Sequence, residues 1–127
     1  MKISDKFHLE DINKLKNTVL TGKTEDIKWR IQHINIVSKL LDENKKEIIK
    51  SLFVDLGKSE IEGLSEILLV KEEISLIKKK LNSWMRPKKI DTPFYLFPSS
   101  SKVIYEPLGC VLILGPYNYP LLYVLKP

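Results

Sequence analysis

Residues 105–120 read YEPLGCVLILGPYNYP and contain a five-residue apolar run, CVLIL at 110–114, between turn-forming residues. An apolar run of this length between glycines and prolines predicts a strand that is buried on both faces. Such strands belong to parallel sheets covered by helices, and the loops after their carboxyl ends carry the ligand chemistry. The sequence therefore predicts an α/β fold in which the loop at 115–120 is functional.

That loop, GPYNYP, contains two prolines and a glycine that restrict its backbone and hold Asn118 between two tyrosines. A rigidly held amide can donate its N–H to an oxygen that becomes negatively charged during a reaction. An asparagine in this position can equally cap the segment that follows, because its side chain satisfies turn and helix-start donors. The spacing alone leaves both interpretations open.

The longer motif EPLGCVLILGPYNYP resembles the signature E-P-x-G-V-x-x-x-I/G-P-W-N-F/Y-P of the aldehyde dehydrogenase superfamily. Tyr119, together with DLGKSE at 55–60, makes the chain most similar to the class 3, fatty-aldehyde and coniferyl-aldehyde branch. The similarity extends from about Trp29 to Pro127. Tyr117 departs from the usual tryptophan, which keeps an aromatic wall but changes its size.

The resemblance implies a role for each residue of the loop. Asn118 would be the oxyanion-hole amide, paired with the backbone N–H of a catalytic cysteine. Tyr119 would form a wall of the aldehyde tunnel. The residues implied along the nicotinamide pocket of a bound NAD or NADP are Leu114, Gly115, Pro116 and Tyr117.

The 127 residues lack several motifs of that family: the K-P-S-E cofactor segment, the glycine-rich turn, the general-base glutamate and the nucleophilic cysteine. The resemblance therefore implies an amino-terminal fragment of an NAD(P)-dependent enzyme that oxidises aldehydes to carboxylic acids. Its fold would be helices plus the first strands of an incomplete Rossmann-like cofactor domain. The complete enzyme is expected to be a homodimer, and the fragment alone to be inactive.

Three segments are expected. Residues 1–90 form a helical segment that packs on the cofactor domain, 91–106 a strand pair of the association arm, and 107–127 the first strand, loop and helix start of the cofactor domain. In the arm, FYLF at 94–97 and VIY at 103–105 are predicted strands. Pro93 and Pro98 flank the first of them and favour an edge position.

Apolar residues at helical spacing predict three helical stretches, the first over 4–20. The second runs from Thr24, its cap, to Gly57, with an interruption expected at 42–46. The third runs from the Ser59-x-x-Glu62 capping box to Pro87. Acids early in the last helix and lysines late complement its dipole and need no further partner. The acids are Glu60, Glu62 and Glu66, and the lysines are Lys78, Lys79 and Lys80. The predicted stripes are Ile27, Ile31, Ile34, Val37 and Leu41, then Ile48, Ile49, Leu52, Phe53 and Leu56, and finally Ile67, Ile74, Ile77, Leu81 and Trp84, widened by Leu64, Leu68 and Leu69.

Composition argues against several other functions. The 21 Lys and Arg exceed the 16 Asp and Glu by five, but the lysines are dispersed without interleaved aromatics, so no nucleic-acid binding is expected. Cys110 is the single cysteine, which excludes an internal disulfide and fits a cytoplasmic location. It lacks basic neighbours in sequence and is predicted to be a buried packing thiol. His8 and His33 lack metal-ligand spacing, so no metal site is expected.

The apolar stretch 110–125 raises the possibility of a membrane anchor. Its sixteen residues fall short of the roughly 20 that a spanning helix needs. Glycine, asparagine and two prolines also interrupt it, so no membrane association is expected. The alternative function is a small, non-enzymatic helical interaction protein with an apolar docking strand. In either case the isolated chain is expected to be poorly soluble, because 111–125 would lack covering elements.

Overall fold

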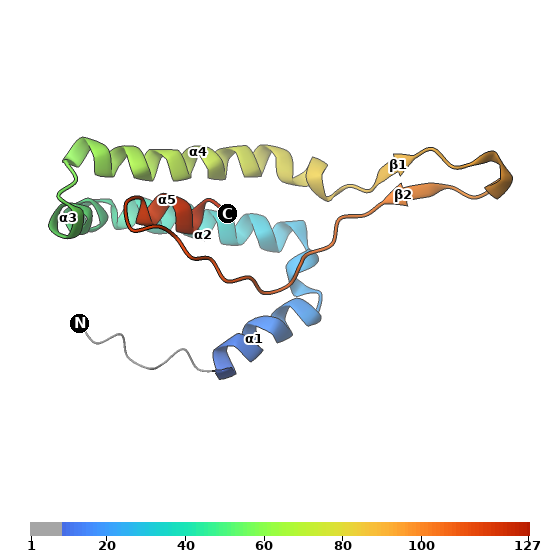
Figure 1. The fold of residues 1–127 in the computed structure, drawn as a ribbon, viewed down its shortest axis with the longest axis horizontal. Coiled ribbons are helices and arrows are strands. Elements are labelled where there is room, and N and C mark those ends of the chain that lie inside the picture. Colours follow the sequence, from blue (N-terminus) through green and yellow to red (C-terminus); the bar gives the residue numbers. More distant parts are fainter. Residues whose placement is uncertain (1–8) are drawn as a thin grey trace.

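The computed structural model describes residues 9–127, which form helices and one small hairpin (Figure 1). The helix α4 lies alongside α2 and α3, and α5 packs against α4. The hairpin projects beyond the end of α4. In chain order the elements are α1 (Leu9–Leu20), η1 (Lys23–Glu25), α2 (Ile27–Glu43), α3 (Lys45–Leu56), α4 (Glu60–Met85), β1 (Lys88–Ile90), η2 (Phe94–Leu96), β2 (Ser101–Val103) and α5 (Pro120–Leu125).

The second helix begins later than the sequence predicts, and the first is described from Leu9 onward. The prediction of a helix over 4–20 is confirmed for Leu9–Leu20, and its first part lies outside the described residues. Gly22 ends this part with a φ of 72°, a conformation that glycine adopts without strain. The predicted cap at Thr24 is wrong, because Lys23–Glu25 forms a short 3₁₀ turn. Asp26 caps α2 instead, and its carboxylate accepts a hydrogen bond from the Lys28 N–H at 3.0 Å.

The expected interruption at 42–46 is present as a break between α2 and α3. Asn44 has φ −104° and ψ 12°, so it continues neither helix. Its backbone N–H and its side-chain amide both donate to the Leu40 carbonyl, at 3.0 and 2.9 Å, near the end of α2. α3 ends as predicted at Gly57, which is left-handed with φ 68°.

The capping box at the start of α4 is confirmed in both directions. The Ser59 side chain accepts from the Glu62 N–H at 3.3 Å, and the Glu62 carboxylate accepts from the Ser59 N–H at 2.8 Å. The helix ends at Met85, two residues before the predicted stop at Pro87. These local signals fix both ends of the longest element.

The core lies where α2, α3 and α5 meet α4. Leu41, Ile67, Val70 and Ile74 form its fully buried cluster, with exposed fractions of 7% or less. The three predicted stripes are confirmed for most of their members, but Phe53, Leu56 and Trp84 are 62%, 37% and 48% exposed. The broad apolar face of α4 exceeds what its neighbours cover, and Leu68 and Leu69 are also exposed for this reason.

The hairpin is displaced from its predicted position. β1 pairs antiparallel with β2, with Lys88 opposite Val103 and Ile90 opposite Ser101. The predicted strand at 94–97 is wrong, because Phe94–Leu96 forms a 3₁₀ turn at the tip. Pro93 and Pro98 lack the N–H that strand pairing requires, and they flank this turn.

Residues 104–116 form neither helix nor strand and run as a long extended segment from the hairpin to α5 (Figure 1). The predicted buried strand at 110–114 is therefore wrong for this structure. Cys110 is exposed, so the predicted packing thiol is also wrong. A strand forms only when a neighbour pairs with its backbone groups, and the sheet in residues 9–127 consists of β1 and β2.

The described part of the chain is thus mostly helical with a small two-stranded sheet. None of its helices is both long enough and apolar enough to cross a membrane. The division into segments at 90 and 106 stays a prediction.

Candidate functional site

The candidate site is the turn at 117–119 and the short helix α5 that follows it. Pro120 is the first residue of α5, where its missing N–H costs nothing and its fixed φ favours the helix. Leu121 and Leu122 pack against the core cluster of α2 and α4. The sequence therefore attaches the turn to the helical layer through the residues immediately after it.

The carboxylate that caps α5 comes from α4. Glu66 Oε1 accepts hydrogen bonds from the backbone N–H groups of Leu121 at 2.8 Å and Leu122 at 3.0 Å. Its other oxygen, Oε2, accepts from Lys58 Nζ at 2.7 Å. The prediction that Glu66 needs no partner is wrong, because this side chain is fully buried and satisfied by three donors.

Lys58 connects this carboxylate to the turn itself. Its side chain is 13% exposed, and its ammonium lies 4.0 Å from the centroid of the Tyr119 ring. A desolvated ammonium over an aromatic face is attracted by the ring quadrupole. Tyr119 also meets Tyr123 edge to face at 6.1 Å between centroids. Tyr119, the predicted tunnel wall, is therefore held on one side by α5 and on the other by Lys58.

Asn118 lies in the turn and is exposed to solvent. The residue that caps α5 is Tyr119, and no side chain at that position makes a capping hydrogen bond. Because Glu66 accepts from the first N–H groups of α5, the interpretation of Asn118 as the cap of this segment is wrong. The exposed position also differs from the tip of a buried parallel strand that the sequence predicted.

The other predicted site residues lie in the end of the extended segment and in the turn that follows it. Leu114 and Tyr117 are each 84% exposed, and Tyr119 is 43% exposed. A Cβ on Gly115 would lie 2.6 Å from Val124 Cγ2, so a larger residue at this position would require the Val124 side chain in α5 to shift. Pro116 follows it in the same exposed stretch.

Tyr117 also contributes to a groove of about 690 Å³ between α3 and the start of α5. The other residues of this groove are Asn44, Glu47, Ile48, Ser51, Leu52, Asp55, Leu56, Pro120 and Leu121. Its charged members are Glu47 and Asp55, which repel phosphate groups. The residues present do not form a site for NAD or NADP on their own.

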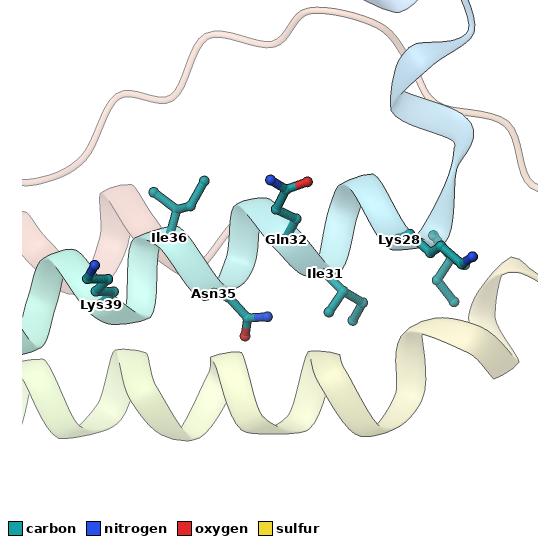
Figure 2. A pocket seen from close by; sticks show the side chains of 7 residues that line it. Lys28, Ile31, Gln32, Asn35, Ile36 and Lys39 are labelled. Carbon is teal, nitrogen blue, oxygen red and sulfur yellow. The ribbon is translucent and has the colours of Figure 1, made fainter.

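A second groove, of about 540 Å³, lies along α2 (Figure 2). In that view Gln32 and Ile36 point away from α4, whereas Ile31 and Asn35 point toward it. This groove contains none of the predicted site residues. Over residues 9–127, no three His, Cys, Asp or Glu side chains gather in a way that could hold a metal ion.

Comparison with known proteins relates this arrangement to one family. The model of the aldehyde dehydrogenase family matches residues 17–127. An aldehyde dehydrogenase of Craterostigma plantagineum is 35% identical over 117 residues, which are 91% of this chain and 24% of that protein. The 4,4'-diaponeurosporen-aldehyde dehydrogenase of Staphylococcus aureus is 38% identical over 108 residues, 84% of this chain and 24% of that protein. Family 3 member I1 of Arabidopsis thaliana is 35% identical over 117 residues, 91% of this chain and 21% of that protein.

A solved structure also resembles this chain. The substrate-bound state of Staphylococcus aureus AldH superimposes with a TM-score of 0.86 at 34% identity, over 93% of this chain and 26% of that one. The similarity confirms the predicted fold class, an incomplete part of an α/β enzyme. Family 3 relatives confirm the predicted branch. The chain spans about a quarter of the length of the relatives it matches.

Proposed function

This chain belongs to the aldehyde dehydrogenase family, and on that premise we propose that it supplies the oxyanion-binding turn of an enzyme that oxidises aldehydes to carboxylic acids. The observation that carries the proposal is the position of Asn118. It lies in a turn that contacts the helical layer through Tyr119 and Leu121, and Glu66 caps the first N–H groups of α5. The Asn118 amide is therefore not needed to cap α5 and can donate a hydrogen bond to a bound substrate.

In this proposal the Asn118 side chain donates its N–H to the aldehyde oxygen when a nucleophile attacks the carbonyl carbon. The oxygen then gains negative charge, and a donor already in place stabilises it with little reorganisation. NAD or NADP, bound by the complete protein, supplies the hydride acceptor. Because the residues present form at most one wall of that cofactor's site, we assign them no step through it.

The test is a hybrid enzyme in which residues 17–127 of this chain replace the matching segment of the Staphylococcus aureus 4,4'-diaponeurosporen-aldehyde dehydrogenase. We expect the hybrid enzyme to oxidise aldehyde with reduction of a nicotinamide cofactor, and the 127-residue chain alone to show no turnover. Asn118→Ala should lower kcat by about 10²–10³-fold, the cost of losing one oxyanion donor. Asn35→Ala, at an exposed position on α2, is the matched control and should leave kcat unchanged. An Asn118→Ala hybrid with full kcat contradicts the proposal.

We also propose that the β1–β2 hairpin belongs to the association arm of a homodimer. The hairpin projects from the helices (Figure 1), and Phe94 and Phe97 at its tip are 91% and 86% exposed. Large exposed aromatics gathered at one place favour a protein partner. In the hybrid enzyme, Phe97→Asp should convert dimers into monomers, as measured by light scattering after gel filtration. A dimer that survives this change contradicts the assignment.

A further inference from the structure

Among residues 9–127, Glu66 is the one polar or charged residue that is buried. Its side chain has no exposed surface and lies next to the apolar cluster of Ile67 and Val70. A buried carboxylate is costly unless hydrogen bonds and an opposite charge compensate it. Here two backbone N–H groups and one ammonium do so, at 2.7–3.0 Å.

These three donors connect Glu66 to one turn. Leu121 and Leu122 lie in α5 just after the turn, and Lys58, between α3 and α4, contacts the ring of Tyr119 within it. Glu66 is 55 residues earlier in the chain than Leu121, so the contact is tertiary. One side chain on the long, well-anchored helix α4 therefore fixes the position of the segment that presents Asn118.

The electrostatics favour the same arrangement. A negative charge near the first N–H groups of a helix interacts favourably with the helix dipole, and hydrogen bonds to an ionised group are stronger than neutral ones. Lys58 pairs with the other oxygen of the carboxylate, so the buried charge has an opposite charge beside it. The two carboxylate oxygens have different partners: Oε1 accepts from the N–H groups of Leu121 and Leu122, and Oε2 accepts from Lys58.

We propose that Glu66 is a positioning residue for the proposed reaction: through Lys58 and the N–H groups of Leu121 and Leu122, it holds the turn that carries Asn118. The inference rests on the proposed role of Asn118. A role in stability alone would affect the helical layer as a whole. A positioning role affects the turn and the rate of the chemical step.

The first test measures hydrogen exchange of individual amides by NMR in the full 127-residue chain. Glu66→Gln removes the charge and should raise the exchange rates of the Leu121 and Leu122 amides by about tenfold to a hundredfold. Because this variant leaves Lys58 without its counterion, a second variant, Lys58→Met with Glu66→Leu, replaces the pair by apolar side chains. Replacing a buried ion pair by apolar side chains of similar volume often leaves the stability of the protein unchanged or increases it. The double variant should therefore retain slow exchange at Ile67 and Val70 in α4 while exchange accelerates at Leu121 and Leu122.

Glu73→Gln is the matched control. Glu73 also joins α4 to α5, through an ion pair of 3.5 Å with Lys126, but at the far end of α5 from Asn118. In Glu73→Gln we expect the exchange rates of the Leu121 and Leu122 amides to stay within about twofold of those in the unsubstituted chain. Unchanged rates in both Glu66 variants would overturn the proposal.

The second test uses the hybrid enzyme with the same variants. The double variant should lower kcat by about tenfold or more while the KM for aldehyde changes by less than about twofold, because misplacing a catalytic group affects the chemical step. Faster exchange at Leu121 and Leu122 without a loss of kcat would overturn the positioning role. An Asn118→Ala hybrid that keeps its kcat would instead refute the proposed function, and the exchange result would still show whether Glu66 holds the turn.

Discussion

The helical layer buries leucine and other apolar side chains, whereas the extended segment 104–116 exposes them. In the layer, Leu41, Ile67 and Val70 have exposed fractions of 0–2%. In the segment, Leu108, Leu112 and Leu114 are 97%, 77% and 84% exposed. Leucine is buried in one region and exposed in the other, so residue type alone does not explain the difference.

The difference lies in where each element finds its hydrogen bonds. A helix pairs its own N–H and C=O groups, so α4 needs neighbours only for its apolar face. A strand must pair its backbone with another strand, and β1 and β2 do so only with each other. The apolar run at 110–114 therefore remains extended and unpaired. The poor solubility expected of the isolated chain stays a prediction, which this exposed apolar surface supports.

The largest expected effect compares one leucine from each region. Leu41→Ala should lower the free energy of unfolding by about 2–5 kcal/mol, because it creates a cavity in the fully buried cluster. Leu112→Ala should change the same quantity by less than about 0.5 kcal/mol, because its side chain is already in water. Urea titration followed by far-UV circular dichroism measures both. Equal losses for the two variants would mean that the segment is packed in solution.

The smallest expected effect is on how the urea midpoint of unfolding depends on pH. Hydrogen bonds from the Ser59 N–H, then from the Ser59 hydroxyl, together with the charge of Lys58, hold the pKa of Glu62 below its ordinary value. A carboxyl whose pKa is lower in the folded state stabilises the fold above its unfolded pKa, and this contribution disappears as pH falls through the folded pKa. Urea midpoints measured from neutral to acidic pH should therefore fall less steeply in Glu62→Gln.

Glu106→Gln, in the extended segment, is the matched control for that series. Because the Glu106 side chain is exposed to solvent, the pH dependence of the urea midpoint should be the same as in the unsubstituted chain. If Glu62→Gln also left this dependence unaltered, the capping box would not contribute to stability through its charge.

Local signals in the sequence predicted the helices well. The capping box at Ser59 and Glu62, and the glycines Gly22 and Gly57, mark helix ends through contacts within a few residues. Thr24 was the exception, since Asp26 two residues later is a better-placed cap. The periodic apolar positions likewise predicted most of the core, although Val70 was missed because the predicted stripe ran along other positions of the broad apolar face of α4.

The tertiary features could not be predicted in this way. Glu66 looks like any acid in the first turns of a helix, and its partners at Leu121 and Leu122 are far away in sequence. A buried carboxylate gives no periodic signal that separates it from an exposed one. The strand at 110–114 was predicted from its apolar run alone, whereas its formation depends on neighbours that the run does not encode.

The most direct test of this account is hydrogen exchange at the amides of Val111, Leu112, Ile113 and Leu114, measured in the 127-residue chain and in the hybrid enzyme. We predict exchange at the rates of an unstructured peptide in the chain alone, and protection of about tenfold or more in the hybrid enzyme, where strand neighbours are supplied. Protection already present in the chain alone, or absent from an active hybrid enzyme, would contradict the account.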